Sequence, residues 1–221
     1  MERQAFLEGL RARLSGGGPP PNLPHPIPPA SGVPPIGHPR LAEPPVEVFA
    51  ETAAAHAWNL RRVVDEADLA RLMAEVCEAE GVRSAVLSGE PEAARVGPLL
   101  QALGVEIRPW GSPADAAGAD LGVTGAVFGL AATGSVAVSS SAAGGRSVSL
   151  LPPVHLALVP ASRVVASASE VWRRLPECLP DGLPSQLVFI SGPSRSADIE
   201  FTLTVGVHGP KRVWLALLDN Q

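Results

Sequence analysis

After residue 45 the chain alternates amphipathic helical segments with short, wholly apolar segments, and this alternation restricts the fold more than any other feature. Residues 154–159 are continuously apolar, and residues 187–190 and 213–218 are two further runs of this kind. Such runs are typical of strands covered on both faces, as in a parallel sheet. The intervening helices would cover both faces of that sheet. The sequence therefore predicts one α/β domain over residues 46–221, with a mostly parallel sheet.

One helix of this domain is marked at both ends, by Asp65 as a plausible N-cap and Gly81 as a C-terminal stop. Its apolar residues recur at offsets of three and four and so share one buried face; they are Leu69, Leu72, Met73, Val76 and Cys77. Cys77 is accordingly interpreted as a core residue and not as a nucleophile. Further helices are predicted at residues 46–55 and 90–103, and further strands at 57–64, 84–88 and 105–109.

Residues 122–151 are rich in Gly, Ser and Val and carry scarcely any charge, which is typical of β-hairpins. Residues 127–132 and 135–141 flank a Thr133-Gly134 pair, as a tight hairpin turn requires. A second reversal is predicted at residues 142–145. Farther along, Ser167-x-x-Glu170 forms a capping box ahead of another helix.

The N-terminal part, residues 1–45, differs from the rest. Residues 19–45 contain 12 of the 24 prolines, so neither a helix nor a central strand persists there. A short amphipathic helix over residues 3–14 is predicted to precede this Pro-rich arm. The arm is interpreted as a linker over the domain surface, because long Pro-rich segments more often connect than recognise; the alternative is a strap that contacts a partner subunit.

Composition excludes several classes of function. The formal charge of −5, without a Lys/Arg run, argues against a nucleic-acid-binding protein, which needs a basic face. No segment approaches the roughly 18 apolar residues that cross a bilayer, and no signal peptide is predicted. Cys77 and Cys178 lie far apart in the sequence, so no disulfide framework, iron–sulfur cluster or zinc site is expected. We predict a cytoplasmic protein without a metal or cofactor of its own.

A polar, Gly-containing loop directly follows the apolar run 187–190. In an open parallel sheet, ligands collect beyond the carboxyl ends of the strands. A short helix predicted after the run would present free N–H groups to a phosphate or carboxylate, and Arg195 would add a bidentate fork. The candidate ligand-binding residues of this loop are Ser191, Gly192, Pro193, Ser194, Arg195, Ser196, Asp198 and Glu200. The alternative is that Ser194 or Ser196 merely caps the helix.

Other polar turns are weaker candidates. His208 stands between small and rigid residues; it is either a ligand or acid–base group, since imidazole titrates near neutrality, or a surface residue. The Gly/Thr loops are what any hairpin needs. These turns add His208, Gly209, Thr124, Gly125, Thr133, Gly134 and Ser135 to the candidate ligand-binding set. His155 is interpreted as a satisfied core histidine. No catalytic residue is assigned, because no Gly-x-Ser-x-Gly elbow supports serine chemistry.

Five short sequence segments, taken together, resemble the signature of the LutC/YkgG family, whose domain is the LUD domain. They are residues 122–126, 132–135, 149–155, 191–200 and 206–211. The resemblance spans about residues 46–219 and implies a fold like that of the NagB/RpiA/CoA-transferase proteins. It also implies a role in lactate utilisation, beside two iron–sulfur partner proteins that jointly oxidise L-lactate to pyruvate.

Two functions are compatible with this resemblance. The first is an accessory subunit that binds a small anionic ligand next to the iron–sulfur partners. The second is a stand-alone enzyme acting on a small phosphorylated or acyl substrate through His208, Arg195 and Asp198. Many relatives carry Glu and Asp where this chain has Ala132 and Val127. Since a glutamate is the nucleophile in the transferases of this fold, Ala132 excludes a glutamyl-CoA mechanism and favours the accessory role.

Overall fold

The computed structural model describes residues 44–140, 146–179, 182, 184–197, 203–206 and 208–219. The helix predicted at residues 3–14, nearly all of the Pro-rich arm and the second reversal at 142–145 lie outside the described residues. The division of the chain at residue 45 stays a prediction.

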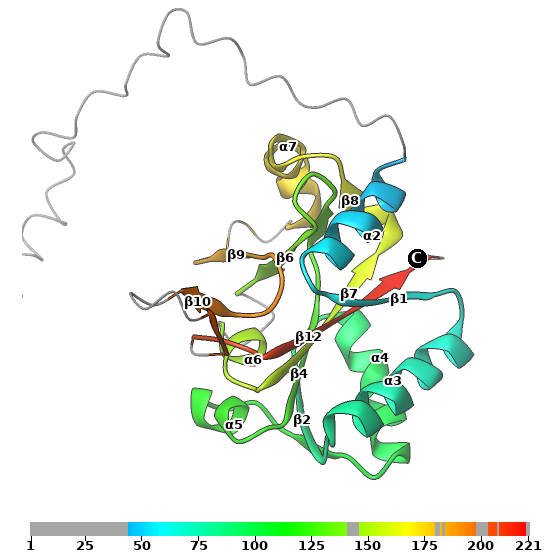
Figure 1. The fold of residues 1–221 in the computed structure, drawn as a ribbon, viewed down its shortest axis with the longest axis vertical. Helices are drawn as coiled ribbons and strands as arrows, with labels where there is room; N and C mark the ends of the chain where they lie inside the picture. The colour runs from blue at the N-terminus through cyan, green and yellow to red at the C-terminus, as the bar shows by residue number, and fades with distance from the viewer. Residues whose placement is uncertain are drawn as a thin grey trace, which may run out of the picture. The chain divides into compact units, whose positions relative to one another are not determined.

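The larger sheet has six strands, all parallel, in the order β1-β12-β7-β4-β2-β3 (Figure 1). They are β1 (Asn59–Val63), β2 (Ser84–Leu87), β3 (Glu106–Arg108), β4 (Leu121–Gly125), β7 (Val154–Pro160) and β12 (Arg212–Leu218). β7, which is apolar apart from His155, lies between β4 and β12 and is buried along its whole length. The prediction of a mostly parallel sheet is confirmed.

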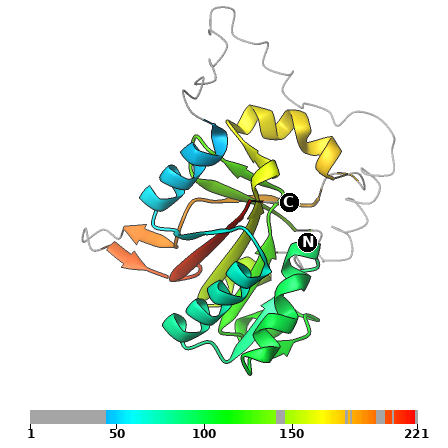
Figure 2. The ribbon, with the colours of Figure 1, turned by 90° about the vertical axis from the view of Figure 1, so that its right-hand side faces the viewer.

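Helices cover both faces of this sheet, as predicted. On one face α3 (Glu66–Glu80) and α4 (Pro91–Ala102) pack against alternate strand residues such as Leu156. The next residue of β7, Ala157, points to the opposite face and contacts residues of α2 (Pro45–Ala55) and of a second sheet. Figure 2 shows α3 and α4 on the far side of the large sheet from α2. Two short helices, α5 (Pro113–Ala117) and α6 (Ser147–Leu150), lie on the α2 side.

The second sheet has the strand order β8-β5-β6-β9. Its strands are β5 (Phe128–Leu130), β6 (Ser135–Ser139), β8 (Val164–Val165), which follows the 3₁₀ turn η1 (Ala161–Arg163), and β9 (Leu187–Ile190). β5 and β6 form the predicted antiparallel hairpin, with Gly134 at a φ of 56° in its turn. The outer face of this sheet is covered by α7 (Ala168–Cys178).

β9 differs from its prediction. It pairs antiparallel with β6 at the edge of the second sheet, and its residues are only partly buried. The Phe189 ring is 38% exposed and meets Trp172 of α7 edge-on, with ring centroids 6.3 Å apart. The prediction that residues 187–190 form a buried strand of the parallel sheet is therefore wrong, since an apolar run alone does not distinguish a central strand from a strand at a sheet edge.

The predicted ends of α3 are confirmed. The Asp65 carboxylate accepts a hydrogen bond of 2.8 Å from the Asp68 N–H, and Gly81 closes the helix at a φ of 65°. Cys77 is half-buried and packs against the core, as expected from its place on the apolar face. At α7 Ser167 is the N-cap, as predicted, but the capping box is not formed. The Ser167 side chain makes no cap hydrogen bond, and the Glu170 carboxylate accepts from the N–H of Ala166, one residue earlier. Within the described part of the chain, no helix is long and apolar enough to cross a membrane.

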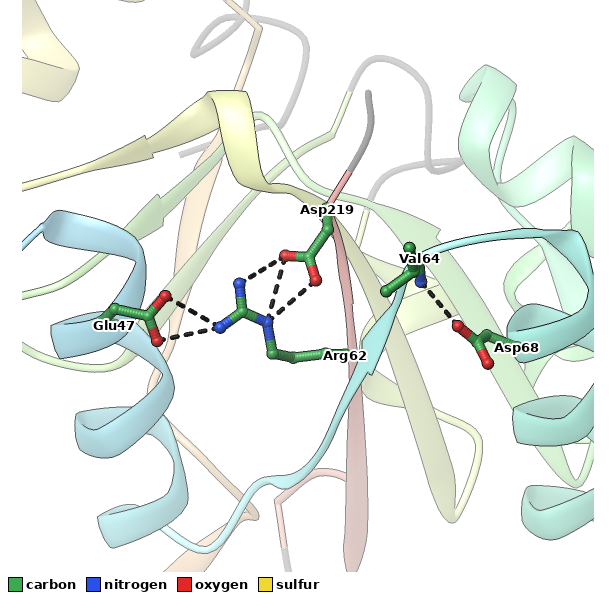
Figure 3. A network of polar contacts seen from close by, with 5 residues as sticks. All are labelled: Glu47, Arg62, Val64, Asp68 and Asp219. Atoms are coloured by element: carbon green, nitrogen blue, oxygen red, sulfur yellow. Dashed lines mark hydrogen bonds and ion pairs between the residues drawn. The ribbon is translucent and has the colours of Figure 1, made fainter.

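Arg62 of β1 joins α2 to the end of β12 (Figure 3). Its guanidinium donates to both carboxylate oxygens of Asp219, at 2.8–3.2 Å, and to both of Glu47, at 2.9 and 3.0 Å. These bonds, first to Asp219 and then to Glu47, raise the pKa of Arg62. Because the Arg62 side chain is 44% exposed, each pair contributes at most about 1 kcal/mol. The contacts connect α2 to the edge of the large sheet formed by β1 and β12.

Candidate functional site

The loop that follows β9 lies at the amino ends of β7 and β12. The Ser194 N–H donates to the Pro210 carbonyl at 3.0 Å, and the Lys211 N–H donates to the Pro153 carbonyl at 2.9 Å, immediately before β12 and β7 begin. The prediction that this loop sits at the carboxyl ends of parallel strands is therefore wrong. It failed because β9, which delivers the loop, belongs to the other sheet.

No helix follows this loop among the described residues. Instead β10 (Arg195–Ala197) pairs antiparallel with β11 (Leu203–Val205), so the predicted helix is also wrong. The backbone groups of β10 pair with a strand whose residues lie six to ten positions farther along the chain, a partner that local sequence does not reveal. Asp198 and Glu200 lie outside the described residues, as does the side chain of Ser196.

Three hydroxyl groups from the predicted set form a continuous chain. Thr133 Oγ1 lies 2.7 Å from Ser135 Oγ, which lies 2.6 Å from Ser191 Oγ. Ser135 is 3% exposed, whereas Thr133 and Ser191 are exposed. The pairing of β6 with β9 brings these residues together, since Ser135 begins β6 and Ser191 follows β9. Because each hydroxyl both donates and accepts, a ligand at one end can polarise the whole chain.

Two glycines seat these loops against the C-terminal end of α2. Gly192 has a φ of 109°, and a Cβ there would lie 2.2 Å from the His56 carbonyl oxygen. Gly134 has a φ of 56°, and a Cβ there would lie 2.5 Å from the Ala53 nitrogen. The indole of Trp58 also donates to the Gly134 carbonyl at 3.1 Å. Positive φ and close backbone approach both require glycine, so both loops hold a fixed position on α2.

A second group of predicted residues surrounds Ser194. Its carbonyl accepts from the Gly206 N–H at 2.8 Å, and its hydroxyl accepts from the His208 N–H at 3.3 Å. A Cβ on Gly209 would lie 3.2 Å from the Ser194 Cβ. The side chains of His208 and Arg195 are exposed, and Pro193 is half-buried. The residues that the structure gathers around loop 191–194 are called the loop site below: Thr133, Ser135, Ser191, Ser194, Arg195 and His208.

Thr124 and Gly125 lie elsewhere. Thr124 is fully buried, and its Oγ1 lies 2.9 Å from Nε2 of His155. Gly125 is the last residue of β4 and lies at the carboxyl end of the large sheet. Arg212 begins β12, so it and the loop before it lie at the amino end. These two candidates are therefore not part of the loop site.

His155 is a core histidine, as interpreted from the sequence, but it is not fully satisfied. It is 0% exposed, and its Nδ1 has no hydrogen-bond partner among the described residues. Burial lowers the pKa of His155 to about 4. The imidazole is neutral at physiological pH and does not serve as a cation for an anionic ligand.

Sequence reasoning overlooked a polar group at the carboxyl ends of β2 and β4. It contains Ser88, Glu90 and Glu92, together with Arg163 of η1. The available signal was the string Ser88-Gly-Glu-Pro-Glu92, which directly follows a buried strand. In the described part of the chain, no three or more His, Cys, Asp or Glu side chains are grouped so as to hold a metal ion.

These features define a class of protein: an α/β domain with two sheets, whose hydroxyl-lined loops meet at the amino ends of the large parallel sheet. The loop site offers hydrogen-bond donors and one exposed guanidinium. Donors of this kind can form charge-assisted hydrogen bonds with a small anion.

The chain belongs to the LUD-domain family, because the model of the LUD domain matches residues 46–218. It is 45% identical over 104 residues to Lactate utilization protein C of Shouchella clausii, covering 47% of this chain and 45% of that protein. With Lactate utilization protein C of Halalkalibacterium halodurans it is 47% identical over 105 residues, covering 47% and 46%. The chain thus matches somewhat less than half the length of these curated relatives. A crystal structure of a DUF162-family protein from Deinococcus radiodurans has the same fold, with a TM-score of 0.59, 24% identity and coverage of 79% and 96%.

Proposed function

We propose that this chain is an accessory, ligand-binding subunit in L-lactate utilisation, acting beside iron–sulfur partner proteins that oxidise L-lactate to pyruvate. The observation that carries the proposal is the match of residues 46–218 to the LUD domain, together with relatives named Lactate utilization protein C. The role of an accessory subunit is supported by the cysteines. Cys77 packs in the core under α3, whereas Cys178 packs in the separate core under α7. The two thiols therefore belong to different cores, an arrangement unsuited to holding an iron–sulfur cluster.

The ligand of this subunit is a small carboxylate held at the loop site. Hydroxyl and backbone N–H groups donate hydrogen bonds to carboxylate oxygens, and the exposed Arg195 adds a positive charge with fork geometry. The Thr133–Ser135–Ser191 chain has its buried member in the middle and exposed members at both ends. Such a chain can reorient its protons to donate toward an anion that arrives at either end.

The Arg195→Ala variant is expected to bind L-lactate or pyruvate about tenfold more weakly than the wild-type protein, with unchanged thermal stability. A charged hydrogen bond contributes roughly 1.5–3 kcal/mol, and exposure of Arg195 places the effect at the lower end. Isothermal titration calorimetry on the full chain measures it. Arg71→Ala is the matched control, because that arginine is 72% exposed and lies on α3.

A second pair of variants tests whether the hydroxyl chain itself, and not the loss of any serine, affects the binding of the ligand. Ser135→Ala should weaken the same binding, whereas Ser140→Ala should not, since Ser140 bonds Ser185 at 3.0 Å outside the loop site. If Arg195→Ala and Ser135→Ala both bind these carboxylates as tightly as the wild type, the ligand is not held at the loop site.

A further inference from the structure

The neighbouring strands β2 and β4 send the chain to opposite faces of the large sheet. From β2 the chain continues into α4, which packs with α3 on one face. From β4 it continues through Ala126 into the second sheet on the other face. In an open α/β sheet, a crevice for ligands forms between two such strands, beyond their carboxyl ends. The loop site lies at the amino ends of β7 and β12, so the carboxyl ends of β2 and β4 are a separate location.

Two glutamates meet at the carboxyl ends of β2 and β4. One carboxylate oxygen of Glu90, Oε2, accepts a hydrogen bond from the Ser88 hydroxyl and a long one, 3.4 Å, from the Gly125 N–H. The Glu92 carboxylate turns toward the same glycine, because a Cβ on Gly125 would lie 3.2 Å from Glu92 Oε2 and 2.7 Å from Glu90 Cβ. Both glutamate side chains therefore lie directly against Gly125, where only a residue without a side chain fits.

One cation contacts this pair. Arg163 of η1 donates to Glu92 Oε1 at 2.9 Å and to the Ala126 carbonyl at 3.0 Å. The nearest arginine of α4, Arg95, is bonded instead to Glu66 of α3. Among the described residues, one positive charge therefore balances one of the two carboxylates, and the other has no counter-charge.

Two oxygens of the pair are left without partners. Glu90 Oε1 and Glu92 Oε2 are both buried, and neither has a hydrogen-bond partner among the described residues. Glu92 as a whole is only 7% exposed. Two ionised carboxylates with bare oxygens in one buried place would repel each other and lack solvation, a cost that a single proton on one of them removes.

We propose that Glu90 and Glu92 form a second binding site, in which one proton is held by the pair and which takes the hydroxyl group of a small uncharged ligand. Because Glu92 is paired with Arg163, it stays ionised, and the proton of the pair belongs to Glu90. Burial acts in the same direction and raises the pKa of Glu90, although hydrogen bonds from Ser88 and Gly125 oppose the shift. A hydroxyl both accepts and donates, and so satisfies the protonated Glu90 Oε1 and the ionised Glu92 Oε2 together.

Charge selects the kind of ligand. With Glu90 neutral and Glu92 paired to Arg163, the site carries no net charge, and so neither an anion nor a cation gains from entering it. Close to the pair in the chain and in contact with it, Gly89 is exposed and the Arg163 side chain keeps 37% of its surface in solvent. The ligand is thus an uncharged alcohol or polyol, in contrast to the carboxylate of the loop site.

The presence of a proton on Glu90 is tested by a pH titration of the carboxyl ¹³C signals of the glutamates in the full chain. One signal should titrate above the usual range of glutamates, disappear in Glu90→Gln and shift in Glu92→Gln. Glu66→Gln is the control, since Glu66 is 65% exposed and should leave that signal unchanged. The wild-type titration needs no variant to fold. The proposal is overturned if every glutamate signal titrates in the usual range of glutamates. It is also overturned if a signal with a raised titration midpoint is still present in Glu90→Gln.

The ligand class is tested with three probes: 1,2-propanediol, acetate and methylammonium. Only 1,2-propanediol should give saturable shifts of the Ser88 and Gly125 amide signals in the full chain. Those shifts should vanish in the wild type as pH rises and Glu90 ionises, but persist in Glu90→Gln, whose amide still donates. The proposal fails if an ionic probe shifts these amides equally, if the diol shifts none, or if Glu90→Gln follows the wild-type pH dependence.

Discussion

The Phe49→Ala variant is expected to lose about 3–5 kcal/mol of unfolding free energy, which is the usual cost of truncating a buried aromatic ring. Phe49 lies on α2 and is 0% exposed. A Cβ on Gly129 of β5 would lie only 3.0 Å from Phe49 Cζ and 3.1 Å from Val159 Cγ1. The ring therefore fills the space between the second sheet and the large sheet, and its loss leaves a cavity that neither sheet can close. Urea denaturation followed by circular dichroism measures the change.

Phe189→Ala is the matched control for this prediction. Phe189 sits on the edge strand β9 and is 38% exposed, so its truncation removes less buried surface and should cost about 1 kcal/mol. Equal losses in the two variants would mean that α2 is not an integral part of the core between the sheets. In that case the anchoring of the Gly134 and Gly192 loops on α2 would lose its basis.

The stability of the wild-type protein should fall by about 3 kcal/mol between pH 7 and pH 4 through His155 alone. Burial lowers the pKa of His155 from 6.5 to about 4, and each pKa unit corresponds to about 1.4 kcal/mol. In this pH range the unfolded chain binds a proton that the folded protein does not accept. The stabilisation is thus fully present above about pH 6.5 and is lost as pH falls through about 4.

A His155→Leu variant isolates this contribution. It loses the hydrogen bond to Thr124, so it should be less stable at pH 7, but its stability should decline less steeply toward pH 4. His56→Gln is the control, since His56 is exposed and its loss should leave the wild-type pH dependence intact. Parallel pH profiles for wild type and His155→Leu would show that His155 already carries a proton or is hydrated in the fold.

Local signals in the sequence were sufficient for much of the fold. Asp65 and Gly81 mark the ends of α3 because capping and left-handed backbone depend on the residues themselves. The strand β7 was equally clear, since a run of its length that is apolar apart from His155 is buried on both faces. The hairpin around Gly134 followed from the residue types in its turn.

The wrong predictions concern the pairing of strands that lie far apart in the sequence. The run 187–190 is apolar on both faces, so it lacks the alternation that would have marked an edge strand. Once β9 was assigned to the wrong sheet, the loop after it was placed at the wrong end of the domain. The contact of Ser135 with Ser191 likewise depends on the β6–β9 register, which no local pattern encodes. Glu90 was overlooked because acidic residues at the start of a helix are ordinarily stabilising there.

Growth on L-lactate, after deletion of the gene in the organism that encodes this chain, tests the central claim most directly. The proposed function predicts that the deletion strain fails to grow on L-lactate but grows normally on glucose, and that the wild-type gene restores growth. A deletion strain that grows on L-lactate as fast as its parent, without a second LUD-domain gene to replace the lost one, would contradict a role in lactate utilisation.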